Sequence, residues 1–175
     1  MSSGNNRLSR RVREGRMEYR IRRRNDRSTT PEVLTKAILA FCQKIEPTQE
    51  PIYIPCRPTE WSAPLNCHNN VAHQIALAQG SAVLGWAIWS DVDMHDAEWH
   101  CCWRSPAGET VDITPHGTEK QILFLPSTDI GWDVSRDGVR PNRAYALTQD
   151  GRRKLGELKK LSRLLGKTRD FILVN

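Results

Sequence analysis

Residues 98–114 read Glu-Trp-His-Cys-Cys-Trp-Arg-Ser-Pro-Ala-Gly-Glu-Thr-Val-Asp-Ile-Thr, and polar and apolar side chains alternate on either side of a Ser-Pro-Ala-Gly turn. Alternation with a period of two is the pattern of a half-buried β-strand. The stretch therefore predicts two antiparallel strands, Glu98–Arg104 and Glu109–Thr114. Each strand has one polar face and one face of Trp, Cys or aliphatic residues.

The turn between these strands decides whether their polar faces coincide. Pro106 and Gly108 suit a type I turn that is closed by a glycine bulge. In such a three-residue loop Ser105 pairs with Glu109. A two-residue loop would shift the register by one residue and turn the polar side of the second strand toward the Trp residues, so the apolar pattern rejects it.

The three-residue loop brings an imidazole and a carboxylate together. It places His100 opposite Thr114, which makes Asp112 a diagonal neighbour of His100 at roughly 7–8 Å between Cα atoms, within side-chain reach. The local sequence thus predicts a His100–Asp112 pair on one polar face.

Upstream of the hairpin, the sequence predicts two helices around a short strand. A Thr-Thr-Pro-Glu opening and apolar residues at helical spacing indicate a helix from near Thr30 to about Ile45. Ile52–Pro55 is typical of a strand, and a Pro-rich loop follows it. A second helix starts at Asn66 or Cys67 and runs to about Gln79, where Gly80 ends it.

The remaining elements give the fold class. Strands are expected at Gly85–Trp89 and Gln121–Leu125, an acidic turn at Asp91–Asp96, a loop over 127–142, and a last helix over about 148–165. Helices, then an antiparallel sheet, then a helix predict an α+β fold. The domain division is an Arg-rich arm at 1–28 and one catalytic domain at 29–175.

Composition narrows the class of protein. Five Cys form an odd, unevenly spaced set without a CxxC pair, which favours reduced thiols in a cytoplasmic, reducing compartment. No stretch approaches the roughly 18 apolar residues of a membrane span, and no apolar signal segment opens the chain. We expect no cofactor and no membrane span.

The positive charge is concentrated at the N-terminus. The formal charge is +6, and residues 1–27 alone hold ten Arg against three acidic residues, so the rest of the chain is close to neutral. This arm is either partly helical or disordered. A solvated tail, an acidic partner, a nucleic acid bound through counterion release, and a targeting or delivery segment are the alternatives for its role.

Cys67 is the candidate nucleophile. It follows a Pro-containing loop and opens a helix, where unpaired backbone N–H groups and the helix dipole lower the pKa of a thiol. An imidazole oriented by a carboxylate would remove the thiol proton, so Cys67, His100 and Asp112 have the composition of a catalytic triad. The Cys67 amide is one oxyanion donor, and Trp61 or the Asn66 side chain is a weaker candidate for the second.

The order Cys at a helix start, His on a strand and Asp on the next strand resembles the papain-like superfamily in its transglutaminase-like branch. The fragment His100-Cys-Cys-Trp…Gly108-Glu-Thr-Val-Asp112-Ile-Thr-Pro115 is similar to the His-x-x-Trp…Gly…Val-Asp-x-Thr run of that branch. The resemblance covers about residues 50–125. It implies a papain-like fold in which the nucleophile-bearing helix packs on an antiparallel sheet. The chain departs from the usual pattern in having His68, not an aromatic residue, after the nucleophile.

Two other chemistries use the same stretch. Cys102 shares the face of His100 and is a rival nucleophile, although its position inside a strand gives it no helix N-terminus. His95, His100, Cys102 and His116 are the donors of a conceivable metal site, but their spacing matches no closed zinc pattern.

The sequence thus predicts a cysteine-dependent hydrolase that cleaves amide bonds of a protein or peptide, as a protease, amidase or deamidase, through a thioester. A transglutaminase-like acyltransferase with the same triad is the alternative within this class. A nucleic-acid-binding module that uses the Arg-rich arm and the last helix is the alternative outside it. Delivery into a target cell as an effector is an alternative to residence in the cytoplasm.

Overall fold

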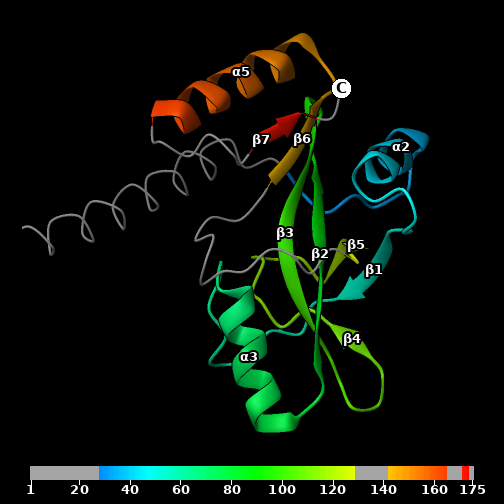
Figure 1. Ribbon diagram of the computed structural model, residues 1–175, viewed down its shortest axis with the longest axis vertical. Coiled ribbons are helices and arrows are strands. Elements are labelled where there is room, and N and C mark those ends of the chain that lie inside the picture. The colour runs from blue at the N-terminus through cyan, green and yellow to red at the C-terminus, as the bar shows by residue number, and fades with distance from the viewer. Residues whose placement is uncertain (1–27, 129–141, 165–170, 174–175) are drawn as a thin grey trace, which may run out of the picture.

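A long antiparallel hairpin of β2 (Ser81–Ser90) and β3 (Met94–Arg104) runs through the fold (Figure 1). The computed structural model describes residues 28–128, 142–164 and 171–173. The predicted arm over 1–27, most of the predicted loop over 127–142 and residue 165 of the predicted last helix lie outside these ranges.

One seven-stranded sheet contains the hairpin. Its order is β1 (Ile52–Pro55), β5 (Gln121–Pro126), β2, β3, β6 (Asn142–Ala146) and β7 (Phe171–Leu173), and β4 (Thr110–Val111) pairs with β3. Pairing is antiparallel except between β6 and β7. With α2 (Lys36–Ile45), α3 (Cys67–Ala78) and α5 (Gln149–Leu164), the described residues form a mixed α+β fold, as predicted.

Part of this sheet curls until its ends meet. Asp112, which directly follows β4, forms a parallel bridge with Cys56, which directly follows β1. The Asp112 N–H donates to the Pro55 carbonyl at 3.0 Å, and the Arg57 N–H donates to the Asp112 carbonyl at 2.8 Å. Strands β1, β5, β2, β3 and β4 therefore form a nearly closed ring, which we call the barrel.

The barrel has an apolar interior. Its core residues come from four strands, and they are Ile54, Ala87, Cys102, Ile122 and Phe124. Gly85 lies opposite His100 in the β2–β3 pair, and a Cβ at Gly85 would lie 2.6 Å from the Phe124 ring. Since side chains alternate along a strand, His100 and Cys102 share this inner face.

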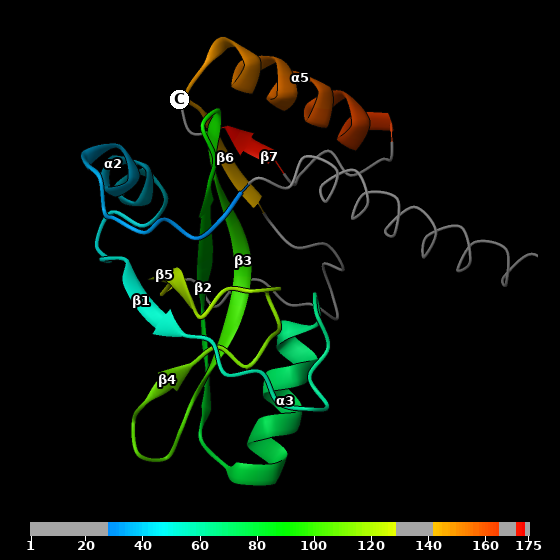
Figure 2. The same ribbon diagram turned by 180° about the vertical axis from the view of Figure 1, so that it is seen from behind.

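The outer face of the hairpin carries two helices. α2 packs on Trp86, Trp99 and neighbouring residues, and α3 packs on Cys101 and residues near it. Leu84 contacts both clusters, so one apolar face is continuous from one helix to the other. The right-handed twist of long strands turns this face along the hairpin, which explains why the two helices lie on opposite sides in Figures 1 and 2.

Several predicted boundaries were wrong for identifiable reasons. α2 begins at Lys36, capped by Thr35, and not near Thr30. The Thr30 hydroxyl instead accepts the Leu123 N–H at 2.7 Å, and Thr29 bridges to Ser90, so this segment is bound to the sheet.

The strands also differ from the prediction. β2 and β3 are longer than expected, because the turn between them is only residues 91–93. β4 has two residues instead of six, because the chain leaves β3 at Asp112 to pair with the segment after β1. β6 and β7 were not predicted at all.

Candidate active site

The turn of the β3–β4 hairpin has the predicted geometry. The Ser105 N–H donates to the Glu109 carbonyl at 2.8 Å, and the Gly108 N–H donates to the Ser105 carbonyl at 2.9 Å. Gly108 has a φ of 89°, the left-handed conformation that a glycine bulge requires. Since Arg104 pairs with Thr110, the predicted register is confirmed.

That register brings His100 and Asp112 into contact. The His100 Nε2 and the Asp112 Oδ2 lie 2.9 Å apart, and both side chains are almost completely buried. The predicted His–Asp contact is confirmed. Because Nε2 is bonded to the carboxylate, Nδ1 is the ring nitrogen that is available to a nucleophile.

Asp112 is bound from three sides. Its Oδ1 accepts the Thr114 N–H at 2.8 Å, and its Oδ2 lies 2.8 Å from the Nε2 of His116 as well as 2.9 Å from that of His100. Burial alone would raise the pKa of Asp112, but the charge and hydrogen bond of His100 and the hydrogen bond of His116 hold this pKa well below its usual value. Asp112 is therefore an anion that orients both imidazoles.

His100 is held in its protonated form. Burial works to lower the pKa of His100, but negative charge at Asp112 and Cys67 and the hydrogen bonds that His100 makes with Asp112 and Cys102 raise it well above the usual 6.5. An imidazolium at neutral pH is one half of the ion pair that activates a thiol.

Cys67 is the first residue of α3, as expected. Its side chain is fully buried and packs in a cluster with Val71, Cys101, Val111 and Ile113 on the outer face of the hairpin. A thiolate at Cys67 would nevertheless raise the pKa of His100, because the two groups lie within electrostatic range of each other.

The pairing of β3 explains how Cys67, on the outer side, influences the pKa of His100 on the inner face. β6 pairs with β3 through Glu98, and β4 pairs with it only from Trp103 onward. Among the described residues, 99–102 therefore have no strand partner on that edge. α3 lies along this half of β3 (Figure 1), and its first residue, Cys67, packs in one cluster with Cys101, which belongs to this unpaired stretch.

The other four cysteines are poor nucleophiles. Burial is the main cause that raises the pKa of Cys42 to about 11, of Cys56 to about 12 and of Cys101 to about 12. Burial also raises the pKa of Cys102 to about 11, although the hydrogen bond between Cys102 and His100 works in the opposite direction. These four side chains are thiols, not thiolates, at neutral pH.

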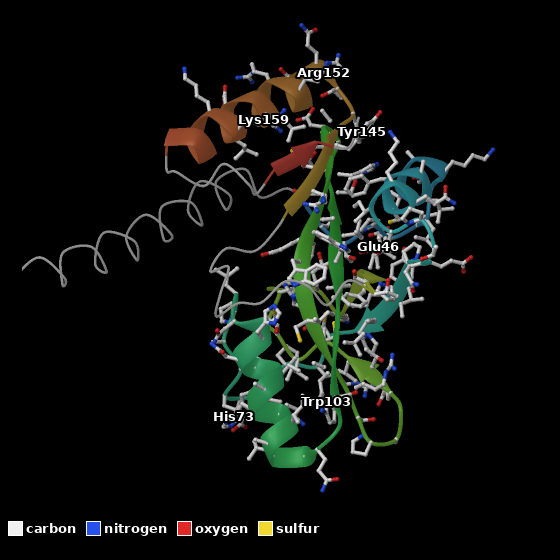
Figure 3. The ribbon with its side chains drawn as sticks, in the orientation of Figure 1. Glu46, His73, Trp103, Tyr145, Arg152 and Lys159 are labelled. Atoms are coloured by element: carbon white, nitrogen blue, oxygen red, sulfur yellow. The ribbon has the colours of Figure 1, made fainter. Side chains whose placement is uncertain are left out.

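The two weaker oxyanion candidates have other contacts. The Trp61 ring lies 4.5 Å from the His73 ring, and Figure 3 shows His73 on the side of α3 that points away from the hairpin. Asn66 is the residue before α3, and its Oδ1 accepts a hydrogen bond from Asn69 at 2.7 Å. The Cys67 backbone amide remains at the helix start, where the sequence placed it.

Sequence reasoning missed Asn70 as a structural part of the site. It is buried one turn after Cys67, and its amide group bonds both backbone groups of Ala63 and the Thr114 hydroxyl. Asn70 therefore ties the loop before α3 and the segment after Asp112 to the start of the helix. A polar residue on the same helix face as Cys67 and Val71 was the available signal.

The alternative metal-donor set of His95, His100, Cys102 and His116 differs in one member from the group that the structure brings together. His95 bonds Ser90 through its Nδ1 at 2.8 Å and lies near Phe41 of α2, on the outer face of the hairpin. His100, Cys102 and Asp112 instead form a buried group whose ligand atoms all lie within 4.8 Å of one another. His116 joins this group through its contact with Asp112.

Comparisons with protein-family models, with curated proteins and with solved structures each return no match for this chain. Among the described helices, none is both long and apolar enough to span a membrane.

Proposed function

We propose that this protein is a cysteine-dependent hydrolase that cleaves amide bonds of a protein or peptide with Cys67, His100 and Asp112 as its triad. The observation that carries the proposal is the buried His100–Asp112 hydrogen bond within electrostatic range of a thiol that opens a helix.

The resting state is a thiolate–imidazolium pair. The raised pKa of His100 keeps the proton on the ring, and the N-terminus of α3 stabilises a negative charge on Cys67. Asp112 holds the ring through Nε2, and in the proposed mechanism Nδ1 exchanges the proton with Cys67.

The reaction has two halves. The Cys67 sulfur attacks the carbonyl carbon, the carbonyl electrons move to oxygen, and the Cys67 backbone N–H donates to that oxyanion. As the C–N bond breaks, His100 gives its proton to the leaving amine, and a thioester remains. Water then gives a proton to His100 and attacks the thioester, which releases the acid and restores the thiolate–imidazolium pair.

An amine in place of water would convert the same thioester into a transferase product. Hydrolysis is the proposed outcome because it needs no second binding site. The curled antiparallel sheet, with a nucleophile-bearing helix packed beside it, supports the proposed kinship with the transglutaminase-like branch of the papain-like proteins.

Burial of Cys67 sets a condition for catalysis. The sulfur is fully covered, and Asn70 holds the preceding loop at Ala63 by hydrogen bonds of 3.1 and 2.8 Å. A substrate carbonyl therefore reaches the sulfur only when the side chains around the start of α3 move aside. Binding of an extended peptide would supply the free energy for that movement.

The experiment is a peptide-library digest. The protein is incubated with a complex mixture of denatured, unmodified peptides, and mass spectrometry scores new termini, deamidation of Gln or Asn, and coupling to an added primary amine. We expect cleavage or deamidation that disappears in Cys67→Ser and His100→Gln and persists in Cys101→Ser. Coupling of the amine to peptides without hydrolysis would show that the protein is a transferase instead of a hydrolase. Turnover that survives in Cys67→Ser would contradict the triad.

The nucleic-acid alternative has less support in the described residues. The basic side chains of α5 are partly neutralised: Lys154 bonds Asp93, and Arg153 contacts both Asp150 and Glu157. The Arg-rich arm that the alternative also needs lies outside the described ranges.

A further inference from the structure

On the inner face of the barrel, three metal-donor side chains gather around the carboxylate of Asp112. The Nε2 atoms of His100 and His116 lie 2.9 and 2.8 Å from the same Oδ2 of Asp112. The Cys102 sulfur completes the group, within 4.8 Å of the donor atoms of His100 and Asp112. The proposed hydrolysis uses neither Cys102 nor His116.

We propose that His100, Cys102, Asp112 and His116 form a binding site for a zinc ion. A second step rests on the proposed function: because zinc would occupy the imidazole that the triad needs, zinc inhibits the hydrolase reversibly. The first step, zinc binding, does not depend on any enzymatic activity.

The two N–O distances around Asp112 are close to those between zinc ligands. Zn–N and Zn–O bonds of about 2.1 Å at a tetrahedral angle put neighbouring N and O ligands about 3.4 Å apart. The two N–O distances in the barrel are shorter than this by about half an ångström, the difference expected when hydrogen bonds instead of a metal join the atoms. Small outward shifts of the side chains would open the position for the ion.

The donor types select zinc among common divalent cations. Imidazole and thiolate suit zinc, whereas magnesium and calcium prefer an all-oxygen shell. The set of two His, one Cys and one Asp fills the four positions of a tetrahedral ion, which is the arrangement of closed, non-catalytic zinc sites. Such a site holds zinc as an inhibitor and leaves no position for an activated water.

The surroundings already orient the donors. The Asp112 Oδ1, which bonds neither imidazole, accepts a hydrogen bond from the Thr114 N–H. The His116 ring lies 5.2 Å from the Trp89 ring and 5.2 Å from the His100 ring. Outer contacts of this kind hold metal ligands in place before the ion arrives. The side chain of His116 is 15% exposed while that of Asp112 is fully buried, so His116 marks the side from which an ion reaches the site.

The experiment uses the full chain, reduced and stripped of metal with a chelator. Zn²⁺ affinity is measured by competition with a chromophoric chelator, and Co²⁺ serves as a spectroscopic substitute that reports a thiolate ligand by a charge-transfer band. We expect one equivalent of either metal, with the Co²⁺ thiolate band present. Cys102→Ser should abolish the band and weaken Zn²⁺ binding by on the order of 100-fold.

Three further variants make the test specific. Cys101→Ser changes the adjacent, equally buried thiol on the opposite face and should leave both readouts unchanged. His116→Gln keeps a donor to Asp112 at a partly exposed position, should fold normally, and should lower Zn²⁺ affinity at least tenfold. Cys67→Ser should keep both metal readouts while losing hydrolysis, so failure of one proposal is separable from failure of the other.

Any of three results would overturn the zinc site: the wild-type protein binds no equivalent of metal, the Co²⁺ thiolate band survives in Cys102→Ser, or Cys101→Ser and Cys102→Ser lose equal Zn²⁺ affinity. If Cys102→Ser does not fold, unchanged Zn²⁺ affinity in His116→Gln would overturn it in the same way. With binding established, hydrolysis that continues at saturating Zn²⁺ would overturn the inhibitory role alone.

Discussion

The carboxylate of Asp112 joins β3 to the segment 112–116 that follows β4. It holds His100 of β3, His116 of the following loop and, through the Thr114 N–H, its own turn. A buried anion with these partners is stable only while the partners remain, and the partners depend equally on the anion. Asp112 is therefore a structural residue as well as a proposed catalytic one.

Replacing Asp112 by Ala should cost about 3–5 kcal/mol of unfolding free energy, because it leaves a buried imidazolium without its counterion. Urea unfolding followed by circular dichroism measures the difference. Glu109→Ala, on the same hairpin, is the control. It removes an ion pair with Arg57 in which the Glu109 side chain is 51% exposed and the Arg57 side chain 61% exposed. That change should stay within about 1 kcal/mol. Equal losses in the two variants would show that Asp112 carries no buried charge.

At the scale of elements, α5 is anchored to the turn between β2 and β3. The Asp93 carboxylate accepts hydrogen bonds from Thr148 and Lys154, and the Asp93 carbonyl accepts the Leu147 N–H at 2.7 Å. The hydrogen bonds from Lys154 and Thr148 lower the pKa of Asp93. Asp93 therefore joins the turn to the segment at the start of α5 through both its side chain and its backbone carbonyl.

This anchor should depend on pH. A carboxyl group whose pKa is lower in the folded state stabilises the fold above its unfolded pKa of about 3.9, and the contribution disappears as the pH falls toward the folded pKa. Asp93→Asn should thus lower the melting temperature at pH 7 and lower it by clearly less at about pH 3, below the unfolded pKa. Asp150→Asn, on the exposed start of α5, should change little at either pH. An equal effect of Asp93→Asn at both pH values would contradict the anchor.

Local sequence patterns predicted some of these elements and contacts but not others. Alternation over 98–104 and the Pro–Ala–Gly turn are local signals, and they were sufficient to predict the His100–Asp112 contact and its register. The partner of Asp112 at Cys56 and the contact of Asn70 with Thr114 join residues far apart in the chain. No local pattern encodes such pairs, so the shortened β4 was missed.

The same reasoning applies to the outer strands. β6 follows a stretch rich in Asp, Gly and Pro, which is a composition typical of loops. β6 is nevertheless a strand, because it pairs with the edge of β3 over residues 94–98. The start of α2 was misplaced because Thr30 has the chemistry of a helix cap but uses its hydroxyl to bind β5. In both cases a tertiary contact outweighed a correct local preference.

On the scale of the whole molecule, the closed ring of strands determines where the site can form. The barrel interior leaves no room for a side chain at Gly85, whose Cβ would lie 2.3 Å from the Leu125 carbonyl oxygen and 2.6 Å from the Phe124 ring. Gly85 lies opposite His100, so this close packing lies directly across the strand pair from the imidazole.

Gly85→Ala should therefore destabilise the protein by about 1–3 kcal/mol through overpacking of the barrel. Thermal unfolding measures the change. Gly156→Ala is the matched control, because that glycine lies within α5 with no atom near its Cβ position, and the change should stabilise the fold by up to about 1 kcal/mol. A neutral Gly85→Ala variant would mean that the barrel interior is not closely packed.

The proposed triad requires that Cys67, alone among the five thiols, is ionised by His100. Alkylation with iodoacetamide at pH 6, mapped by mass spectrometry over time, tests this directly, with the equally buried Cys101 as the internal reference. The account predicts that Cys67 reacts at least tenfold faster than Cys101 and that His100→Gln removes this advantage. Equal labelling of the two cysteines, or a fast Cys67 reaction that persists in His100→Gln, would contradict it.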